Sequence, residues 1–325
     1  MQRRNLILST FASGLAAPAT LRAQGAWPNR PVRIINPYAP GGTSDIIVRP
    51  IAERLQQRLG QPFIVDNRAG AGGTIGTAAG ASATADGYTL LVTNTGPLAV
   101  APSLFPTLTY DPARAFTWIA MFGGAPIVCA VKGDGPIRTL ADYANAARAA
   151  ADAVSFGSSG VGSAGHLTGV LFGMESRAQM LHVPFRGASE AQQSVLSGAT
   201  TSLWDTSGAN AGAIRAGTLR GLAVSTAQRV AALPDVPTCT EAGFPGVVST
   251  NWFLLAAPAG LDPAIAQRLR AALVETLAET ATRERMENVG VVSIGDLDPA
   301  AIGRFVTSET EKWTRVVRAG NVRPG

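Results

Sequence analysis

Short apolar runs alternate with segments of helical periodicity along much of the chain. Residues 32–35, 63–66 and 88–93 are rich in β-branched and aromatic side chains, which is typical of strands. Between the first two runs, Ile47, Ile51, Leu55 and Leu59 repeat at a spacing of four and predict a helix over 44–59. An alternation of strands and helices predicts a mainly parallel sheet with helices on both faces.

The same alternation continues in the middle of the chain. It predicts helices at 140–150, 164–173 and 188–196 and strands at 154–156, 180–183, 202–204 and 219–224. Near the C-terminus, Asp262-Pro263 and Asp298-Pro299 each combine an N-cap residue with proline at the first helical position, which predicts two further helices. A chain of this length exceeds the usual size of one compact core, so two lobes are expected.

Residues 1–26 have the layout of a secretory signal peptide. Arg3 and Arg4 precede an apolar stretch that is too short to span a bilayer, and small residues follow at 23–26. The segment fits a general secretory signal and, through its two arginines, a twin-arginine signal. The sequence therefore predicts a protein that is exported and works in soluble form outside the cytoplasmic membrane.

Composition excludes several classes of function. The formal net charge of +5 falls to +2 when Arg3, Arg4 and Arg22 leave with the signal peptide, and no Lys/Arg cluster with interleaved aromatics indicates nucleic-acid binding. Two histidines and two cysteines offer no zinc-site spacing, so neither a metal nor a cofactor is expected. Cys129 and Cys239 either form one disulfide or pack as two small apolar side chains.

Three loops rich in glycine, serine and threonine, at 38–45, 70–74 and 158–166, each follow a predicted strand and precede a predicted helix. Glycine lets backbone N–H groups approach a ligand, and a helix N-terminus adds partial positive charge, so the loops predict an anion site. The first helix is expected to have Ser44 or Asp45 as its N-cap. A side chain at Gly42 is expected to obstruct the anion and to strain the turn.

An enzyme is the main alternative. Gly160, Gly162 and Gly165 fit the GxGxxG pattern of dinucleotide-binding loops, which would indicate an exported NAD(P)-dependent oxidoreductase. The pattern lacks its acidic partner, because no acid follows the next strand before Glu190. His166 beside several serines lacks a third partner for nucleophilic catalysis, so we do not expect an enzyme. A purely structural surface protein is a further alternative.

The motifs, taken in order, resemble those of the periplasmic solute receptors of the tripartite tricarboxylate transporter family, also called Bug receptors. The resemblance extends over nearly the whole chain after residue 26. It rests on PYAPGGTSD at 37–45, NRAGAGG at 67–73, SSGVGS at 158–163 and HVPFRG at 182–187, and on residues 27–28, 86–91, 110–112, 166–167, 233–238, 241–243 and 257–260.

The resemblance implies a two-lobed periplasmic binding protein of type II-like fold, each lobe a mixed, mainly parallel sheet flanked by helices. Lobe 1 would comprise 27–127 and 252–325, lobe 2 would comprise 128–251, and crossing strands would join them. Such a receptor captures a small carboxylate, which could be a di- or tricarboxylate, an amino acid or an aromatic acid. It delivers the ligand to the integral membrane permease subunits of the transporter, or senses it, and is expected to be a monomer in the periplasm.

The resemblance also implies where the ligand binds. One carboxylate would be held by the loops at Gly41-Gly42 and Gly72-Gly73, partly through water, and Asp205 would face the rest of the ligand. Thr206 after Asp205 and Arg186 depart from the residues usual in the family, so the ligand itself is not identified. The candidate ligand-binding residues are Tyr38, Ala39, Pro40, Gly41, Gly42, Thr43, Asp45, Gly72, Gly73, Thr93, Ser158, Gly162, Ser163, His166, Arg186 and Asp205.

Overall fold

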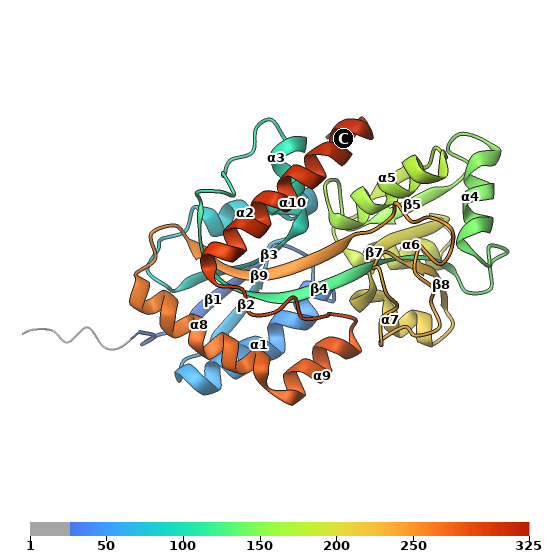
Figure 1. Cartoon of the computed structure of the whole chain (residues 1–325). Helices are drawn as coiled ribbons and strands as arrows, with labels where there is room; N and C mark the ends of the chain where they lie inside the picture. Colours follow the sequence, from blue (N-terminus) through green and yellow to red (C-terminus); the bar gives the residue numbers. More distant parts are fainter. Residues whose placement is uncertain (1–26, 325) are drawn as a thin grey trace, which may run out of the picture.

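The computed structural model describes residues 27–324 and shows two mixed sheets that share one long strand (Figure 1). The predicted signal peptide at 1–26 lies outside the described residues. Across both sheets the strand order is β2-β1-β3-β9-β4-β7-β5-β6, with β8 also paired to β4. We call the part built on the first sheet lobe 1 and the part built on the second sheet lobe 2.

Lobe 1 has a sheet of five strands. β1 pairs in parallel with β2 and β3, whereas β9 runs antiparallel to β3 and to β4. Ile34 and Ile35 of β1 are both fully buried, on opposite faces of the sheet, so both faces are covered. The strands are β1 (Val32–Asn36), β2 (Phe63–Asn67), β3 (Thr89–Asn94), β4 (Phe116–Lys132) and β9 (Thr250–Pro258).

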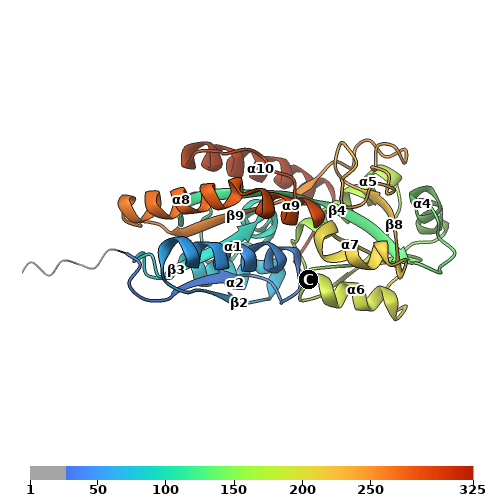
Figure 2. The same ribbon diagram turned by 90° about the horizontal axis from the view of Figure 1, so that it is seen from below.

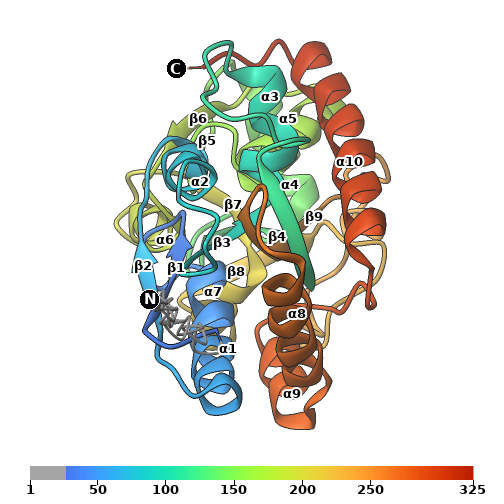
Figure 3. The same cartoon turned by 90° about the vertical axis from the view of Figure 1, so that its left-hand side faces the viewer.

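The helices of lobe 1 cover the two faces of its sheet. α1 and α8 pack on one face, and α10 packs on the other with η2 and α3. The C-terminal helices α8, α9 and α10 lie along one side of the molecule (Figure 3). The elements are α1 (Thr43–Leu59), η1 (Ala71–Gly73), α2 (Thr74–Ala81), η2 (Gly96–Val100), α3 (Ala101–Leu104), α8 (Pro263–Ala278), α9 (Thr280–Asn288) and α10 (Pro299–Ala319).

Lobe 2 is built around the second half of β4. This half pairs antiparallel with β7 and β8, and β5 pairs in parallel with β7 and β6. α1 of lobe 1 and α7 of lobe 2 contact each other across the junction (Figure 2). The elements are α4 (Leu140–Ala149), β5 (Ser155–Ser158), α5 (Ala164–Ser176), β6 (Leu181–Pro184), α6 (Ala188–Leu196), β7 (Ser202–Thr206), α7 (Ser207–Arg215) and β8 (Leu219–Val224).

β4 and β9 run side by side from one lobe to the other (Figure 1). β4 pairs with β9 from Phe116 to Pro126 and with β7 and β8 from Ile127 onward. These are the crossing strands that the resemblance implied. We propose that the lobes divide at 127/128 and 251/252, where the sequence places the boundaries.

Most strands and helices match their sequence predictions within a few residues, and the glycine-rich loop at 70–74 leads into α2 (Thr74–Ala81). The Asp262 and Asp298 N-caps are confirmed, because their carboxylates accept hydrogen bonds from Ala264 N–H and Ala301 N–H at 2.7 Å. Both cysteine thiols are buried and unpaired among the described residues, which agrees with their packing as small apolar side chains.

Candidate functional site

Four helices direct their N-termini at one small cavity between the lobes. α1 comes from lobe 1, and α5, α6 and α7 come from lobe 2. Their first residues or N-caps line the cavity together with strand ends and loop residues. The lining consists of Tyr38, Gly42, Thr43, Ser44, Asn94, Ser159, Ser163, Ala164, Gly165, Ala188, Asp205, Thr206, Asn251 and Phe253.

The cavity has a volume of about 20 Å³ in this conformation. That is enough for a water molecule but far too small for a dicarboxylate. A larger ligand therefore needs the lobes to lie farther apart than they do here.

The N-terminus of α1 is uncapped. Its N-cap is Gly42, not the predicted Ser44 or Asp45, and within the described chain no side chain caps it. The N–H groups of Thr43 and Ser44 therefore have no partner inside the helix. Gly42 has a φ of −73°, so the strain predicted for a side chain at this position is wrong, and obstruction of the cavity is the only effect left.

Asp45 supports the turn before α1 and does not line the cavity. Its Oδ2 accepts a hydrogen bond from Gly41 N–H at 3.1 Å, and its carboxylate pairs with the Arg49 guanidinium at 2.9 Å. Asn67 donates to its Oδ1 at 3.0 Å. Burial alone would raise the pKa of Asp45, but the hydrogen bonds from Arg49, Asn67 and Gly41 outweigh it and lower the pKa. Asp45 thus stays ionised and holds the turn in place.

The other predicted glycine loops face each other across the junction. A Cβ on Gly72, whose φ is +62°, would lie 2.1 Å from the Val161 carbonyl oxygen of lobe 2. A Cβ on Gly160 would in turn lie 3.1 Å from Gly72 N. Glycine at these positions lets the two lobes touch backbone to backbone, which places Gly72 outside the cavity.

Tyr38 connects this contact to the cavity. Its hydroxyl lies 3.0 Å from both the Gly72 carbonyl oxygen and Asn94 Oδ1, and the side chain is buried. Burial raises the pKa of Tyr38 well above its ordinary value, so the hydroxyl keeps its proton at any physiological pH. It therefore donates one hydrogen bond, shared between the two acceptors.

Asp205, at the end of β7, is the buried acid of the cavity. Its Oδ2 accepts a hydrogen bond from the Ser159 hydroxyl, and its Oδ1 accepts from Thr206 N–H at 2.7 Å and from the Thr206 hydroxyl at 3.2 Å. Burial raises the pKa of Asp205, and these hydrogen bonds offset only part of the effect. The cavity thus combines helix N-termini on several sides with one carboxyl group that is costly to ionise.

His166 and Ser158 belong to a separate cluster. The imidazole rings of His166 and His182 stack with centroids 3.7 Å apart, and His182 Nε2 lies 2.7 Å from Ser158 Oγ. Burial lowers the pKa of His166 to about 4 and that of His182 to about 2, so both rings are neutral at physiological pH. Neither ring lines the cavity between the lobes.

Arg186 lies at the mouth of the junction. It lines an open groove of about 420 Å³ together with Gly72 of lobe 1 and Gly160 of lobe 2. Its side chain is exposed and its backbone N–H donates to Glu190 Oε2 at 3.1 Å. Arg186 can therefore attract an anion toward the junction without contacting the cavity.

Of the predicted ligand-binding residues, the structure brings Tyr38, Gly42, Thr43, Ser163 and Asp205 to the cavity. The others surround it or lie elsewhere: Ala39, Pro40, Gly41, Asp45, Gly72, Gly73, Thr93, Ser158, Gly162, His166 and Arg186. Sequence reasoning missed nine residues that line it: Ser44, Asn94, Ser159, Ala164, Gly165, Ala188, Thr206, Asn251 and Phe253. Ser44, Ser159, Ala164 and Gly165 stand inside the predicted loops, whereas no motif marks Asn251 or Phe253 on β9.

The glycines of the GxGxxG pattern are covered by protein. Gly160 faces Gly72, and a Cβ on Gly162 would lie 3.1 Å from the Leu104 side chain. A Cβ on Gly165 would lie 2.1 Å from the Trp204 carbonyl oxygen of β7. In this conformation the three glycines pack against protein, and the loop forms part of the contact between the lobes.

The fold and the site define a two-lobed binding protein of the periplasmic type. The model of the tripartite tricarboxylate transporter family receptor matches residues 47–322, and the chain belongs to this family of periplasmic solute-binding proteins. BugT of Bordetella pertussis is 35% identical over 321 residues, which cover 98% of this chain and 97% of BugT.

Solved structures agree with this assignment. A structure of MatC from Rhodopseudomonas palustris with bound malate is 30% identical with a TM-score of 0.85, covering 90% of this chain and 100% of MatC. A second Rhodopseudomonas palustris protein, solved with adipate, is 31% identical with a TM-score of 0.88, covering 92% of this chain and 100% of that protein. Among the described helices of this chain, none is both long and apolar enough to cross a membrane.

Proposed function

We propose that this protein is a periplasmic receptor that captures a small dicarboxylate between its lobes. The observation that carries the proposal is the convergence of four helix N-termini on one cavity, three of them without a hydrogen bond from their own N-cap side chain. Unpaired N–H groups and the helix dipoles favour an anion there. Relatives of about 30% identity that were solved with malate and adipate support a dicarboxylate as the ligand.

The same proposal includes delivery and location. The receptor would be exported by the signal peptide at 1–26, act as a monomer, and hand its ligand to the integral membrane permease subunits of a tripartite tricarboxylate-type transporter. Family membership supports this partner, and no catalytic role is proposed for any residue of the cavity.

The expected affinity is moderate. Each charge-assisted hydrogen bond contributes about 1.5–3 kcal/mol. Four or five such bonds, less an association cost of roughly 4 kcal/mol or more, leave on the order of 8 kcal/mol, which corresponds to a micromolar Kd. Such an affinity suits capture followed by release.

A thermal-shift screen of residues 27–325 tests the proposal. The panel comprises malate, aspartate, succinate, adipate, citrate and benzoate, with NAD⁺ as the probe of the oxidoreductase alternative. At least one dicarboxylate should raise the melting temperature in a concentration-dependent manner. A rise with NAD⁺ alone, or with none of the compounds, would overturn the receptor function.

A further inference from the structure

Asn251 lines the cavity between the lobes and carries an unpartnered polar atom. The residue is 6% exposed, and its Oδ1 has no hydrogen-bond partner among residues 27–324. Buried side-chain polar atoms are nearly always hydrogen-bonded, because an unpaired acceptor loses its hydration without compensation. The orphaned oxygen at a cavity wall therefore indicates that a ligand or water completes it.

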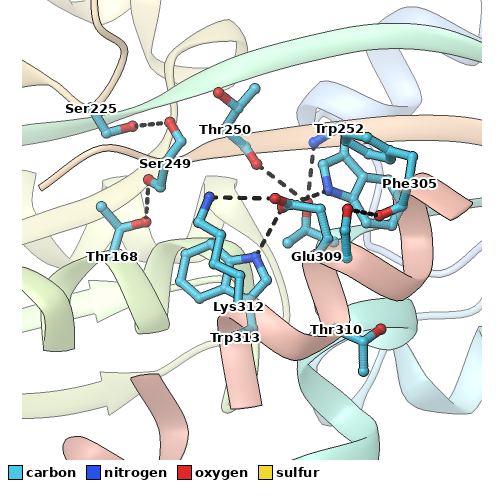
Figure 4. A network of polar contacts seen from close by, with 12 residues as sticks. Thr168, Ser225, Ser249, Thr250, Trp252, Phe305, Glu309, Thr310, Lys312 and Trp313 are labelled. Carbon is cyan, nitrogen blue, oxygen red and sulfur yellow. Dashed lines mark hydrogen bonds and ion pairs between the residues drawn. The ribbon is translucent and has the colours of Figure 1, made fainter. Parts of the chain in front are cut away.

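The strand around Asn251 is fixed on both sides. Ser249 is bound to lobe 2, because its Oγ lies 2.7 Å from Thr168 Oγ1 and its carbonyl oxygen accepts from Ser225 Oγ at 2.8 Å (Figure 4). Trp252 is bound to lobe 1, because its indole N–H donates to Glu309 Oε2 at 3.0 Å. Asn251 therefore stands where β9 passes from one lobe to the other.

Among the amide and carboxylate groups of the cavity lining, Asn251 carries the acceptor oxygen that has no partner among the described residues. The carboxylate of Asp205, which also lines the cavity, already receives hydrogen bonds from Ser159 and Thr206 on its two oxygens. Asn94 Oδ1 already accepts from the Tyr38 hydroxyl. The helix N-termini supply donors for a carboxylate, so the complement of Asn251 Oδ1 is a hydrogen-bond donor carried by the same ligand.

We propose that Asn251 is a specificity-determining residue: its Oδ1 accepts a hydrogen bond from a hydroxyl or ammonium group on the ligand, so the receptor selects substituted dicarboxylates over unsubstituted ones of the same length. This inference rests on the proposed carboxylate-binding function and adds to it the chemical group of the ligand that Asn251 recognises. A site built to bind such a donor discriminates strongly against an analogue that lacks it, because the acceptor is then left unpaired.

Calorimetry with L-malate, L-aspartate and succinate tests the inference, since these C4 dicarboxylates differ in one substituent. Wild-type protein should bind malate or aspartate at least about tenfold more tightly than succinate. Asn251→Leu removes the acceptor at similar volume, so the affinities for malate and succinate should become equal while succinate binding is kept. Asn251→Asp keeps an oxygen in place, so it should retain the preference while all affinities fall through charge repulsion.

The outcomes separate the two proposals. Equal affinity of the wild type for all three compounds, or a preference that survives in Asn251→Leu, overturns the role of Asn251 and leaves the receptor function standing. Failure of the wild type to bind these three and adipate overturns the receptor function itself. If Asn251→Leu does not fold, the wild-type ratio and Asn251→Asp still decide, because loss of the preference in Asn251→Asp contradicts recognition through an oxygen at this position.

Discussion

Thr43 Oγ1 of lobe 1 lies 2.7 Å from Thr206 Oγ1 of lobe 2, at the edge of the cavity. Thr43 also accepts a hydrogen bond from Ala209 N–H at 3.0 Å, and the Thr206 hydroxyl donates to Asp205 Oδ1 at 3.2 Å. Because Thr206 has a single proton, Thr43 donates to Thr206. The contact that closes the lobes therefore ends on the buried carboxyl of the site.

Thr43→Val should weaken lobe closure. The valine has nearly the same shape but cannot form the hydrogen bonds to Thr206 and to Ala209 N–H, which together should cost roughly 2 kcal/mol. We expect a larger radius of gyration by small-angle scattering without ligand, and no loss of affinity for the tightest dicarboxylate, because the cavity of the closed conformation is too small to hold one.

Thr77→Val is the matched control, because Thr77 Oγ1 pairs with Thr93 Oγ1 at 3.2 Å within lobe 1. It should lower stability and leave the radius of gyration unchanged. Equal radii for the two variants would show that the Thr43–Thr206 contact does not set the opening of the lobes.

Gly72→Ala should prevent full closure. The new methyl carbon would lie 2.1 Å from the Val161 carbonyl oxygen, and a backbone atom cannot easily move away. Small-angle scattering without ligand should show a larger radius of gyration than that of the wild type.

Gly60→Ala separates closure from backbone strain. Gly60 also has a positive φ, +77°, but a Cβ there would meet nothing within 4 Å. It should lose about 1 kcal/mol of stability and keep the wild-type radius of gyration. If Gly72→Ala behaves like Gly60→Ala, the lobes do not meet at Gly72 in the ligand-free protein.

Asp205→Asn should raise the melting temperature of the ligand-free protein at neutral pH. The folded-state pKa of Asp205 is raised by burial, so the folded state binds more protons than the unfolded state above the unfolded pKa. The stability that Asp205 provides is therefore present below its unfolded pKa, near 3.9, and is lost as pH rises through the folded pKa. The gain from the substitution should disappear as pH approaches 4.

Asp45→Asn should behave in the opposite way. The pKa of Asp45 is lowered, so its contribution is present above the unfolded pKa and is lost as pH falls. This variant should be destabilised at pH 7, and the deficit should shrink in acid. Melting curves between pH 4 and 8 that show the same sign for both variants would refute the assigned electrostatics.

Glu309→Leu should destabilise lobe 1. The Glu309 carboxylate accepts hydrogen bonds from two buried indole N–H groups, Trp252 at 3.0 Å and Trp313 at 3.2 Å (Figure 4). Leucine would leave both donors unpaired, at a cost of roughly 2–4 kcal/mol in urea unfolding. Glu309→Gln keeps one acceptor oxygen and should lose clearly less. Equal losses for the two variants would mean that the indole hydrogen bonds contribute nothing measurable.

The sequence predicted the helices and strands whose apolar residues repeat at the regular spacing of that element. It missed β4 and β9, because both are apolar on both faces and β4 contains Gly123, Gly124 and Pro126, which are unusual inside a strand. The register of β4 against β9 shifts between Met121 and Gly123, so a strand is possible there despite the glycines.

Only part of the candidate site could be predicted from the sequence. Glycine-rich loops mark close backbone approach, but they do not say whether a ligand or another loop approaches. The Gly41-Gly42 loop reaches the cavity at Gly42, whereas Gly72 meets the backbone of lobe 2. Asn251 could not be predicted, because its role depends on the partners that fix Ser249 and Trp252 in three dimensions.

The central claim is that a dicarboxylate binds between the lobes at the N-terminus of α1, and Gly42→Val tests it most directly. A Cβ at Gly42 would meet only Ala39 O, at an ordinary 3.6 Å, and the backbone is unstrained, so the melting temperature should change little. Calorimetry with malate, aspartate, succinate and adipate should give a Kd on the order of micromolar for at least one compound in the wild type. Gly42→Val should weaken that binding at least about a hundredfold, roughly 3 kcal/mol. Wild-type affinity in the variant, or no binding of any compound to the wild type, would contradict the claim.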